Sequence, residues 1–140
     1  MKLLTLLSFC VILFSACPKV SNQPTYNLGE TIMVPLNQSI QVGNEKINLL
    51  VSEVKEGRCP KGTNCIQAGT AKISMDVAIG DEVSPITLEA KGLCEDESGK
   101  CGSTAYAHGY TVKLFYLYPY PSADNNGNRD YKAKVMIIKK

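Results

Sequence analysis

The sequence lacks tryptophan and has a single histidine, His108, among its 140 residues. One imidazole excludes a metal site built from several histidines, and no Gly-x-Ser-x-Gly sequence supplies the strained turn that presents a serine nucleophile. The 15 basic and 13 acidic residues leave a net charge of +2. Because the lysines are scattered along the chain, nucleic acid is not expected as a partner. The composition therefore favours a protein that is not an enzyme and uses no cofactor.

One apolar run is present, and it lies at the start of the chain. Lys2 precedes an apolar segment over residues 3–14, which Ser15, Ala16 and Cys17 follow. A basic start, a short apolar segment and small residues at a cut site are typical of a secretory signal peptide. The segment is shorter than the roughly 20 apolar residues of a membrane-spanning helix. We therefore expect residues 1–16 to be removed on export.

The residues at this cut, 13–17, read Leu-Phe-Ser-Ala-Cys and resemble the lipobox of bacterial lipoproteins. The resemblance implies that Cys17 is acylated and anchors the protein in a lipid membrane of the cell envelope. The outer membrane, on its periplasmic or surface face, is favoured, and the inner membrane is the alternative. A lipobox cysteine is acylated on its thiol and on its new amino terminus. One acyl chain binds a membrane only marginally, whereas two or more anchor a protein stably. The alternative is cleavage after Ala16 by the general signal peptidase. Residues 17–25 are polar, contain two prolines and predict a short tether before the domain of residues 26–140.

Beyond residue 26 the hydrophobic residues recur with a period of two, as in half-buried strands. Ile73, Met75 and Val77 alternate with Ser74 and Asp76 in the clearest case. Seven strands are expected, at residues 31–36, 39–42, 45–54, 70–79, 86–90, 106–118 and 131–138. The pattern predicts an all-β fold, an antiparallel β-sandwich that is immunoglobulin-like or similar, with a barrel as the alternative.

Four cysteines lie in the exported domain, namely Cys59, Cys65, Cys94 and Cys101. An even number of cysteines in an exported chain indicates disulfides. Pairing within each short segment is favoured, because both segments are polar and contain glycine, so their ends can meet. Cross-pairing is an alternative. A zinc site is another, although the spacings are not Cys-x₂-Cys.

A family resemblance begins at the first of these cysteines. Residues 58–71 read Arg-Cys-Pro-Lys-Gly-Thr-Asn-Cys-Ile-Gln-Ala-Gly-Thr-Ala and are similar to the signature of a family of small Gram-negative lipoproteins without established activity. Residues 110–114, followed by Pro-Tyr-Pro at 119–121, are similar to a later stretch of that family. Gln67 stands where the family commonly has tryptophan, and the 94/101 cysteine pair is an addition. The resemblance implies a lipid-anchored β domain and no particular reaction.

Two further segments are candidates for chemistry. His108 lies between tyrosines in Tyr-Ala-His-Gly-Tyr, where we expect a histidine on the rim of the fold. The alternative is a general base in a hydrolase. Residues 124–130 offer oxygen ligands but lack the glycine and glutamate positions of a calcium-binding loop. A hydrophilic loop is therefore expected there, with calcium binding as the remote alternative.

Tyrosines are concentrated near the end of the chain. Tyr106, Tyr110, Tyr116, Tyr118 and Tyr120 occupy even positions, so an unbroken strand over residues 106–118 would direct them to one face. Tyrosine is enriched at contact surfaces, because its ring is apolar and its hydroxyl is polar. The alternative is that these rings cover an edge of the sandwich.

These observations favour recognition rather than catalysis. Binding residues concentrate on loops that a rigid scaffold holds in place. We expect an envelope protein or a glycan to contact Lys61, Asn64, Tyr116, Tyr118 and Tyr120. The sequence is thus interpreted as a membrane-anchored, non-enzymatic binding module of the cell envelope. A structural or accessory subunit of an envelope complex is the alternative.

Overall fold

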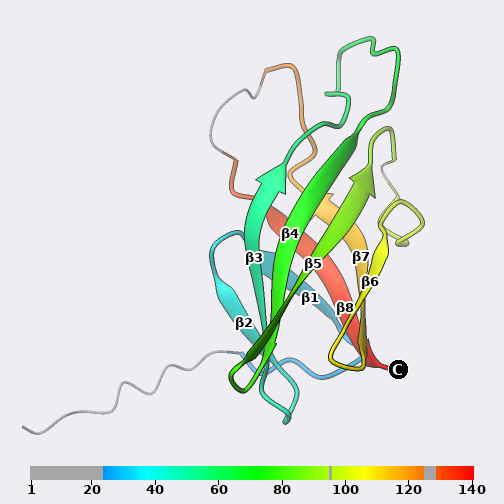
Figure 1. The fold of residues 1–140 in the computed structure, drawn as a ribbon. Coiled ribbons are helices and arrows are strands. Elements are labelled where there is room, and N and C mark those ends of the chain that lie inside the picture. The colour runs from blue at the N-terminus through cyan, green and yellow to red at the C-terminus, as the bar shows by residue number, and fades with distance from the viewer. Residues whose placement is uncertain (1–23, 95, 125–128) are drawn as a thin grey trace, which may run out of the picture.

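The computed structural model describes residues 24–94, 96–124 and 129–140. The expected signal peptide, the Cys17 lipidation site and most of the tether lie outside the described residues. The eight strands are β1 (Thr31–Pro35), β2 (Ser39–Val42), β3 (Ile47–Lys55), β4 (Thr70–Ile79), β5 (Glu82–Lys91), β6 (Thr104–Ala107), β7 (Tyr110–Tyr118) and β8 (Lys132–Lys139). They form two antiparallel four-stranded sheets, ordered β1-β8-β7-β6 and β2-β3-β4-β5 (Figure 1). The expected all-β sandwich is confirmed.

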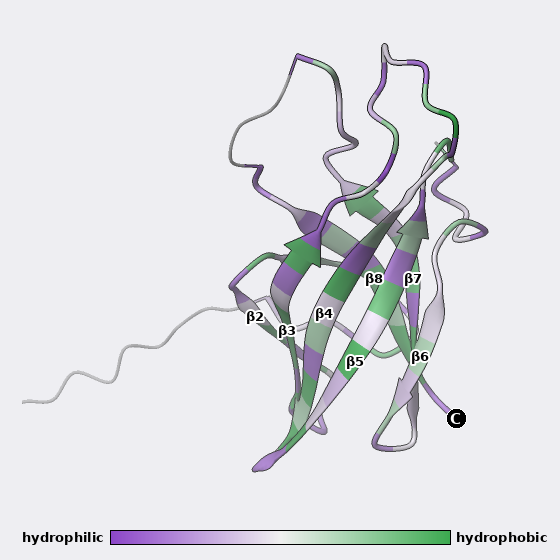
Figure 2. Cartoon of the chain, turned by 45° about the horizontal axis from the view of Figure 1, so that its top comes forward, coloured by the Kyte–Doolittle hydropathy of each residue, from purple (hydrophilic) through white to green (hydrophobic). Residues whose placement is uncertain are grey.

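The core lies between the two sheets and is built from alternate positions of each strand. Ile73, Met75 and Val77 of β4 have no exposed surface, and neither have Val135 and Ile137 of β8. Figure 2 shows the resulting alternation of hydrophobic and hydrophilic residues along β4 and β5. Burying one such aliphatic side chain contributes about 1.5–3 kcal/mol to folding. The period of two in the sequence therefore reports the core correctly.

The segment expected as one strand over residues 106–118 is two strands, so that expectation is wrong. β6 and β7 form a hairpin whose turn is His108 and Gly109, with φ angles of 49° and 76°. Two successive residues with positive φ are what a two-residue turn of type I′ requires. The period of two continues across this turn, so the hydrophobic pattern alone did not reveal it. This hairpin accounts for the eighth strand.

A bulge in β7 also divides the tyrosines. The pairing of β7 with β8 shifts between Leu114 and Tyr116, so the inward and outward positions exchange. Leu114 and Leu117 are both buried, although they are an even and an odd position. Tyr110 consequently lies in the core, whereas Tyr116 and Tyr118 lie on the outer face of the sheet. The expectation of one face for all five tyrosines is wrong.

The two ends of the sandwich differ in their connections (Figure 1). One end, here called the loop end, carries the β3–β4, β5–β6 and β7–β8 loops. The opposite turn end carries the tight β2–β3, β4–β5 and β6–β7 turns and the described start of the chain. Tyr26 is fixed there because its carbonyl oxygen accepts a 2.7 Å hydrogen bond from the Gly43 amide. The long loops and the start of the domain are therefore at opposite ends.

The sheets are joined along one edge near the loop end. Residues 101–103 pair with the end of β5, where the Lys91 amide donates to the Cys101 carbonyl and the Ser103 amide to the Glu89 carbonyl, each at 2.9 Å. The Leu114 amide of β7 donates in turn to the Ser103 carbonyl at 2.9 Å. This segment therefore bridges β5 and β7 and fixes the base of the β5–β6 loop.

Candidate functional site

The loop end is organised around a buried arginine. Among the residues that the structure describes, Arg58 is the only charged one that is buried, and its side chain is 1% exposed. Its guanidinium makes a two-point contact with the Glu56 carboxylate, with Nε–Oε1 at 2.9 Å and Nη2–Oε2 at 2.7 Å. It also donates to the carbonyl oxygens of Leu117 at 3.0 Å and Pro119 at 3.1 Å. Arg58 therefore ties the β3–β4 loop to the end of β7.

Tyr120 extends this cluster to the other loops. The Arg58 guanidinium lies 4.8 Å from the centre of the Tyr120 ring, and the Lys61 ammonium lies 5.5 Å from it. Such cation–π contacts are attractive because the ring face is electronegative. The Tyr120 hydroxyl accepts a 2.7 Å hydrogen bond from the Leu93 amide. One side chain thus contacts both the β3–β4 loop and the β5–β6 loop.

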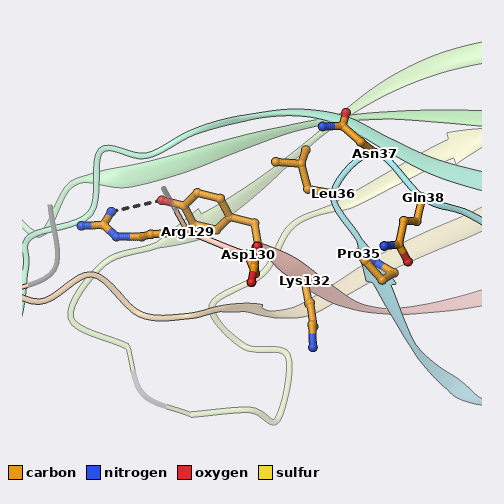
Figure 3. A pocket seen from close by; sticks show the side chains of 8 residues that line it. Pro35, Leu36, Asn37, Gln38, Arg129, Asp130 and Lys132 are labelled. Atoms are coloured by element: carbon orange, nitrogen blue, oxygen red, sulfur yellow. Dashed lines mark hydrogen bonds between the residues drawn. The ribbon is translucent and has the colours of Figure 1, made fainter. Parts of the chain in front are cut away.

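Glu56 is held ionised by its neighbours. Burial by itself would raise its pKa, but the hydrogen bonds and positive charge of Arg58 outweigh burial and hold the pKa of Glu56 below its usual value of 4.5. The Tyr131 hydroxyl donates to the same carboxylate at 3.2 Å and accepts from Arg129 at 3.1 Å, the bond drawn in Figure 3. The charges of Arg58 and Glu56 are therefore paired and hydrogen-bonded, which offsets the cost of removing them from water.

Glycines allow the loop backbones to meet. A Cβ on Gly69 would overlap the Gly57 carbonyl oxygen, and one on Gly92 would overlap the Ala68 carbonyl oxygen. The Gly92 amide donates to the Gly69 carbonyl at 2.9 Å. The Ala-Gly of the sequence motif is thus the place where the β3–β4 and β5–β6 loops touch. No larger residue fits this approach without moving the backbone.

Both local disulfides are present. Cys59 is bonded to Cys65 with Cα atoms 5.9 Å apart, and Cys94 to Cys101 with Cα atoms 6.1 Å apart. Each closes one of the loops at the loop end. Disulfides persist in oxidising compartments, so they indicate a location outside the cytoplasm. Asn64 lies exposed within the first loop, beside Cys65.

A shallow hollow of about 470 Å³ lies between the first disulfide loop and Tyr120. It is lined by Cys59, Pro60, Lys61, Gly62, Thr63, Leu93 and Tyr120. Two apolar side chains near it face solvent: Ile66 is fully exposed and Leu93 is 69% exposed. Leu93 also has a φ of 54°, a conformation that non-glycine residues adopt infrequently. The loop end therefore presents exposed apolar groups in and beside a hollow that both polar and apolar residues line.

A second hollow, also of about 470 Å³, lies beside the start of β8 (Figure 3). It is lined by Pro35, Leu36, Asn37, Gln38, Arg129, Asp130, Tyr131 and Lys132. The Leu36 amide donates to the Tyr131 carbonyl at 2.9 Å and closes one side. Arg129 and Asp130 of the hydrophilic loop expected over residues 124–130 line this hollow, and residues 125–128 of that loop lie outside the described residues.

Tyr116 and Tyr118 belong to a different cluster, on the outer face of β7. Their ring centres are 4.6 Å apart with the planes inclined by 54°. Glu97 of the β5–β6 loop accepts a 2.8 Å hydrogen bond from Lys134 of β8 and another from the Tyr118 hydroxyl. Burial first, and then the bond to Glu97, raise the pKa of Tyr118 to about 12. The structure thus separates Tyr120, at the loop end, from Tyr116 and Tyr118.

His108 lies at the turn end and not within a strand. Its side chain is 18% exposed, and its Nδ1 atom lies 3.7 Å from a carboxylate oxygen of Glu82, the first residue of β5. Tyr106 and Tyr110 flank it in sequence, but Tyr106 is 65% exposed and Tyr110 is buried. His108 is therefore at the opposite end of the sandwich from the disulfide loops.

The sequence reasoning missed Glu56, Arg58, Glu97 and Lys134 as members of these clusters. Arg58 could have been singled out from the sequence, because it is the first residue of the motif at residues 58–71 on which the family resemblance rests. The other motif stretch supplies Pro119 and Tyr120, so the two stretches are in contact. Nothing in the sequence distinguishes Glu97 and Lys134 from other charged residues, because they are 37 positions apart and only the fold brings them together.

No family model, curated protein or solved structure matched this chain in the comparisons. Within the described residues, no helix is of the length and apolar character needed to cross a membrane. No group of three or more histidine, cysteine, aspartate or glutamate side chains is placed to hold a metal ion in that part of the chain.

Proposed function

We propose that this chain is a lipid-anchored recognition module of the bacterial cell envelope, without catalytic activity. One observation carries the proposal: the long loops and both disulfides are gathered at the end of the sandwich opposite the start of the domain. An acylated Cys17 would attach the turn end to the outer membrane through the tether. The loop end then points away from the membrane, toward a partner.

The rigidity of the loop end supports this function. Arg58, Tyr120 and the disulfides hold the loops close to one conformation, and a preorganised surface loses less entropy on binding. Ile66 and Leu93 supply exposed apolar groups, which contribute to contact surfaces when polar residues surround them. Lys61 and Asn64 lie beside them on the same loop end. These four residues form the proposed contact surface.

The test is site-specific photo-cross-linking in intact cells that express the full chain. A photoreactive amino acid replaces Asn64 at the loop end, and the matched control replaces Asn44, which is also exposed but lies in the β2–β3 turn. Adducts with protein or glycan are expected from position 64 and not from position 44. Adducts from position 44 alone would show that the other end makes the contact and that the proposal is wrong.

The same experiment distinguishes the proposed recognition module from the alternative, an accessory subunit of an envelope complex. An accessory subunit occupies its complex permanently, so most of the chain would be captured by one protein in fixed proportion. A recognition module captures its partner only in the fraction that is bound at the time of illumination. The captured fraction at position 64, compared across growth conditions, therefore distinguishes the two functions.

A further inference from the structure

The β5–β6 loop lies against the outer face of β7 as a strap, defined here as residues 94 and 96–101. Gly99 of the strap is buried, and a Cβ built on it would come within 2.9 Å of Lys113 Cε and 3.1 Å of Phe115 Cδ1. The Cys94–Cys101 disulfide closes the strap at its base. Gly99 thus lies against the sheet, whereas residues 96–98 and 100 are exposed.

The Glu97 carboxylate of the strap accepts hydrogen bonds from two donors of the sheet, the Lys134 ammonium and the Tyr118 hydroxyl. Lys134 Nζ lies 2.8 Å from Glu97 Oε2, and the Tyr118 hydroxyl bonds the same carboxylate. Lys134 and Tyr118 stand on neighbouring strands, where Lys134 is directly opposite Tyr116. An ammonium and a phenol that converge on one carboxylate make a site for an anionic group.

The charges around this site favour an anion. Lys113, Lys132 and Lys134 all lie on the outer face of β7 and β8, by the alternation of the strands. The outward positions of β1 are Thr31, Met33 and Pro35, which carry no charge. Within the described strap, Asp96 is used locally, because it accepts hydrogen bonds from the amide and hydroxyl of Ser98 at 2.7 and 2.6 Å. Glu97 is therefore the described acid of the strap that pairs with one of these lysines, Lys134.

The bond that holds Glu97 in place is easily exchanged. The Glu97 side chain is 47% exposed and that of Lys134 is 26% exposed. Ion pairs so open to water contribute little to stability, because solvent screens them. A carboxylate from outside the chain can thus replace that of Glu97 with little loss to the fold.

We propose that Tyr116, Tyr118 and Lys134 form a binding site for the carboxylate of an acidic glycan, and that Glu97 occupies this site until the glycan displaces it. The inference rests on the proposed recognition function and names a ligand class for it. The tyrosine rings favour a sugar over an acidic peptide. C–H groups of a sugar ring pack on the electronegative face of an aromatic ring. The sheet continues from β8 to β1 on the side away from the strap, and an extended polymer can follow its outer face there.

The test measures binding of a fluorescent oligogalacturonate to the full chain purified in mild detergent. Wild type is expected to bind, and added salt is expected to weaken the binding, because exposed charges are screened. Glu97→Gln removes the internal competitor, so it should tighten binding, by about fivefold at most for an exposed ion pair. Lys134→Met should weaken binding by about tenfold or more. Tyr118→Phe, which keeps the ring but loses the hydroxyl, should weaken it less.

The controls separate charge, sugar and fold. Lys139→Met removes a lysine that pairs with Glu45 at 3.2 Å near the turn end, and it should leave binding unchanged. The methyl-esterified oligogalacturonate keeps the sugar rings without the charge and should not bind. Polyglutamate should bind far more weakly than oligogalacturonate, and equal binding would overturn the choice of a glycan. Thermal unfolding of each variant shows whether it is folded.

Two results would overturn the site itself. One is the absence of binding by both wild type and Glu97→Gln, and the other is unchanged binding by folded Lys134→Met. Either result leaves the cross-linking test of the loop end intact, because that test reads position 64 in cells. Conversely, adducts at the turn end alone would reject the proposed function even if oligogalacturonate binds in vitro. The two failures are therefore distinguishable.

Discussion

The guanidinium of Arg58 lies over the ring of Tyr120, 4.8 Å from its centre, although their two loops connect strands of different sheets. The contact joins the disulfide loop after β3 to the loop after β7. It also places the charged group where Glu56 and two carbonyl oxygens can satisfy its donors. The loop end is consequently one connected structure rather than a set of independent loops.

Replacing Arg58 by methionine should therefore destabilise the whole domain. Removing one partner of a buried ion pair typically costs about 3–5 kcal/mol, because the other charge remains without compensation. We expect a loss in the free energy of unfolding near this range, measured by urea denaturation of the oxidised protein. Lys61→Met is the control, since Lys61 also contacts Tyr120 but is exposed, and its loss should cost less than about 1 kcal/mol. Equal effects of the two variants would contradict the buried cluster.

Glu56 should make stability fall in acid. Its pKa in the folded protein lies below the usual value of 4.5, so its contribution is complete above that value and is lost as the pH falls through the lower, folded pKa. Thermal unfolding midpoints measured between about pH 6 and pH 3 should fall less steeply for Glu56→Gln than for wild type. The difference between the two curves isolates Glu56 from other carboxylates. Parallel curves would show that Glu56 titrates alike in both states.

Gly69→Ala should destabilise more than Gly80→Ala, although both glycines have positive φ angles, of 69° and 59°. Around Gly80 there is open space, so its substitution adds only the cost of the left-handed backbone, about 1 kcal/mol. At Gly69 a Cβ also overlaps the Gly57 carbonyl oxygen. Comparison of the two unfolding free energies measures the steric contribution alone. Equal losses would mean that the β3–β4 loop can move away without cost.

How far the sequence specified this fold differs between strands and loops. The alternation of Ile73, Met75 and Val77 predicted β4, because one buried face is all that a strand of a sandwich needs. The division of residues 106–118 was not predicted, because His108 and Gly109 turn the chain without interrupting the period of two. The bulge after Leu114 was hidden for the same reason. The alternation of residues along one strand can be seen in that strand's own sequence. A bulge is a shift in the pairing with the neighbouring strand, so the sequence of one strand does not show it.

The candidate sites were predicted in part. Short cysteine spacings with glycine indicated both disulfide loops, and they placed Lys61 and Asn64 in the first of them. The separation of Tyr120 from Tyr116 and Tyr118 could not be seen, because it follows from the bulge and from the end of β7. The pairing of Glu97 with Lys134 depends on a loop that folds back over a sheet, which no sequence pattern encodes.

The two disulfides should be found by peptide mapping under non-reducing conditions as two internally linked peptides, Cys59 with Cys65 and Cys94 with Cys101. Replacing Cys59 and Cys65 together by serine should lower the free energy of unfolding by about 2 kcal/mol, the value expected for opening so short a loop. The control is the unfolding of wild type in reducing buffer, which should lose at least as much. A peptide that links Cys59 to Cys94 would contradict the local pairing.

Cys17 should determine whether the chain is anchored. Export, cleavage before Cys17 and acylation would leave a mature protein that begins at the lipidated cysteine, and two or more acyl chains make the membrane attachment stable. Cys17→Ser is expected to abolish labelling with radioactive palmitate and to leave unprocessed precursor, whereas Cys10→Ser should alter neither, because residue 10 lies in the removed segment. Labelling and membrane fractionation of the full chain in cells provide the measurement. Unchanged palmitate labelling of Cys17→Ser, or release of a cleaved soluble form from wild type, would reject the lipid anchor in favour of ordinary cleavage after Ala16.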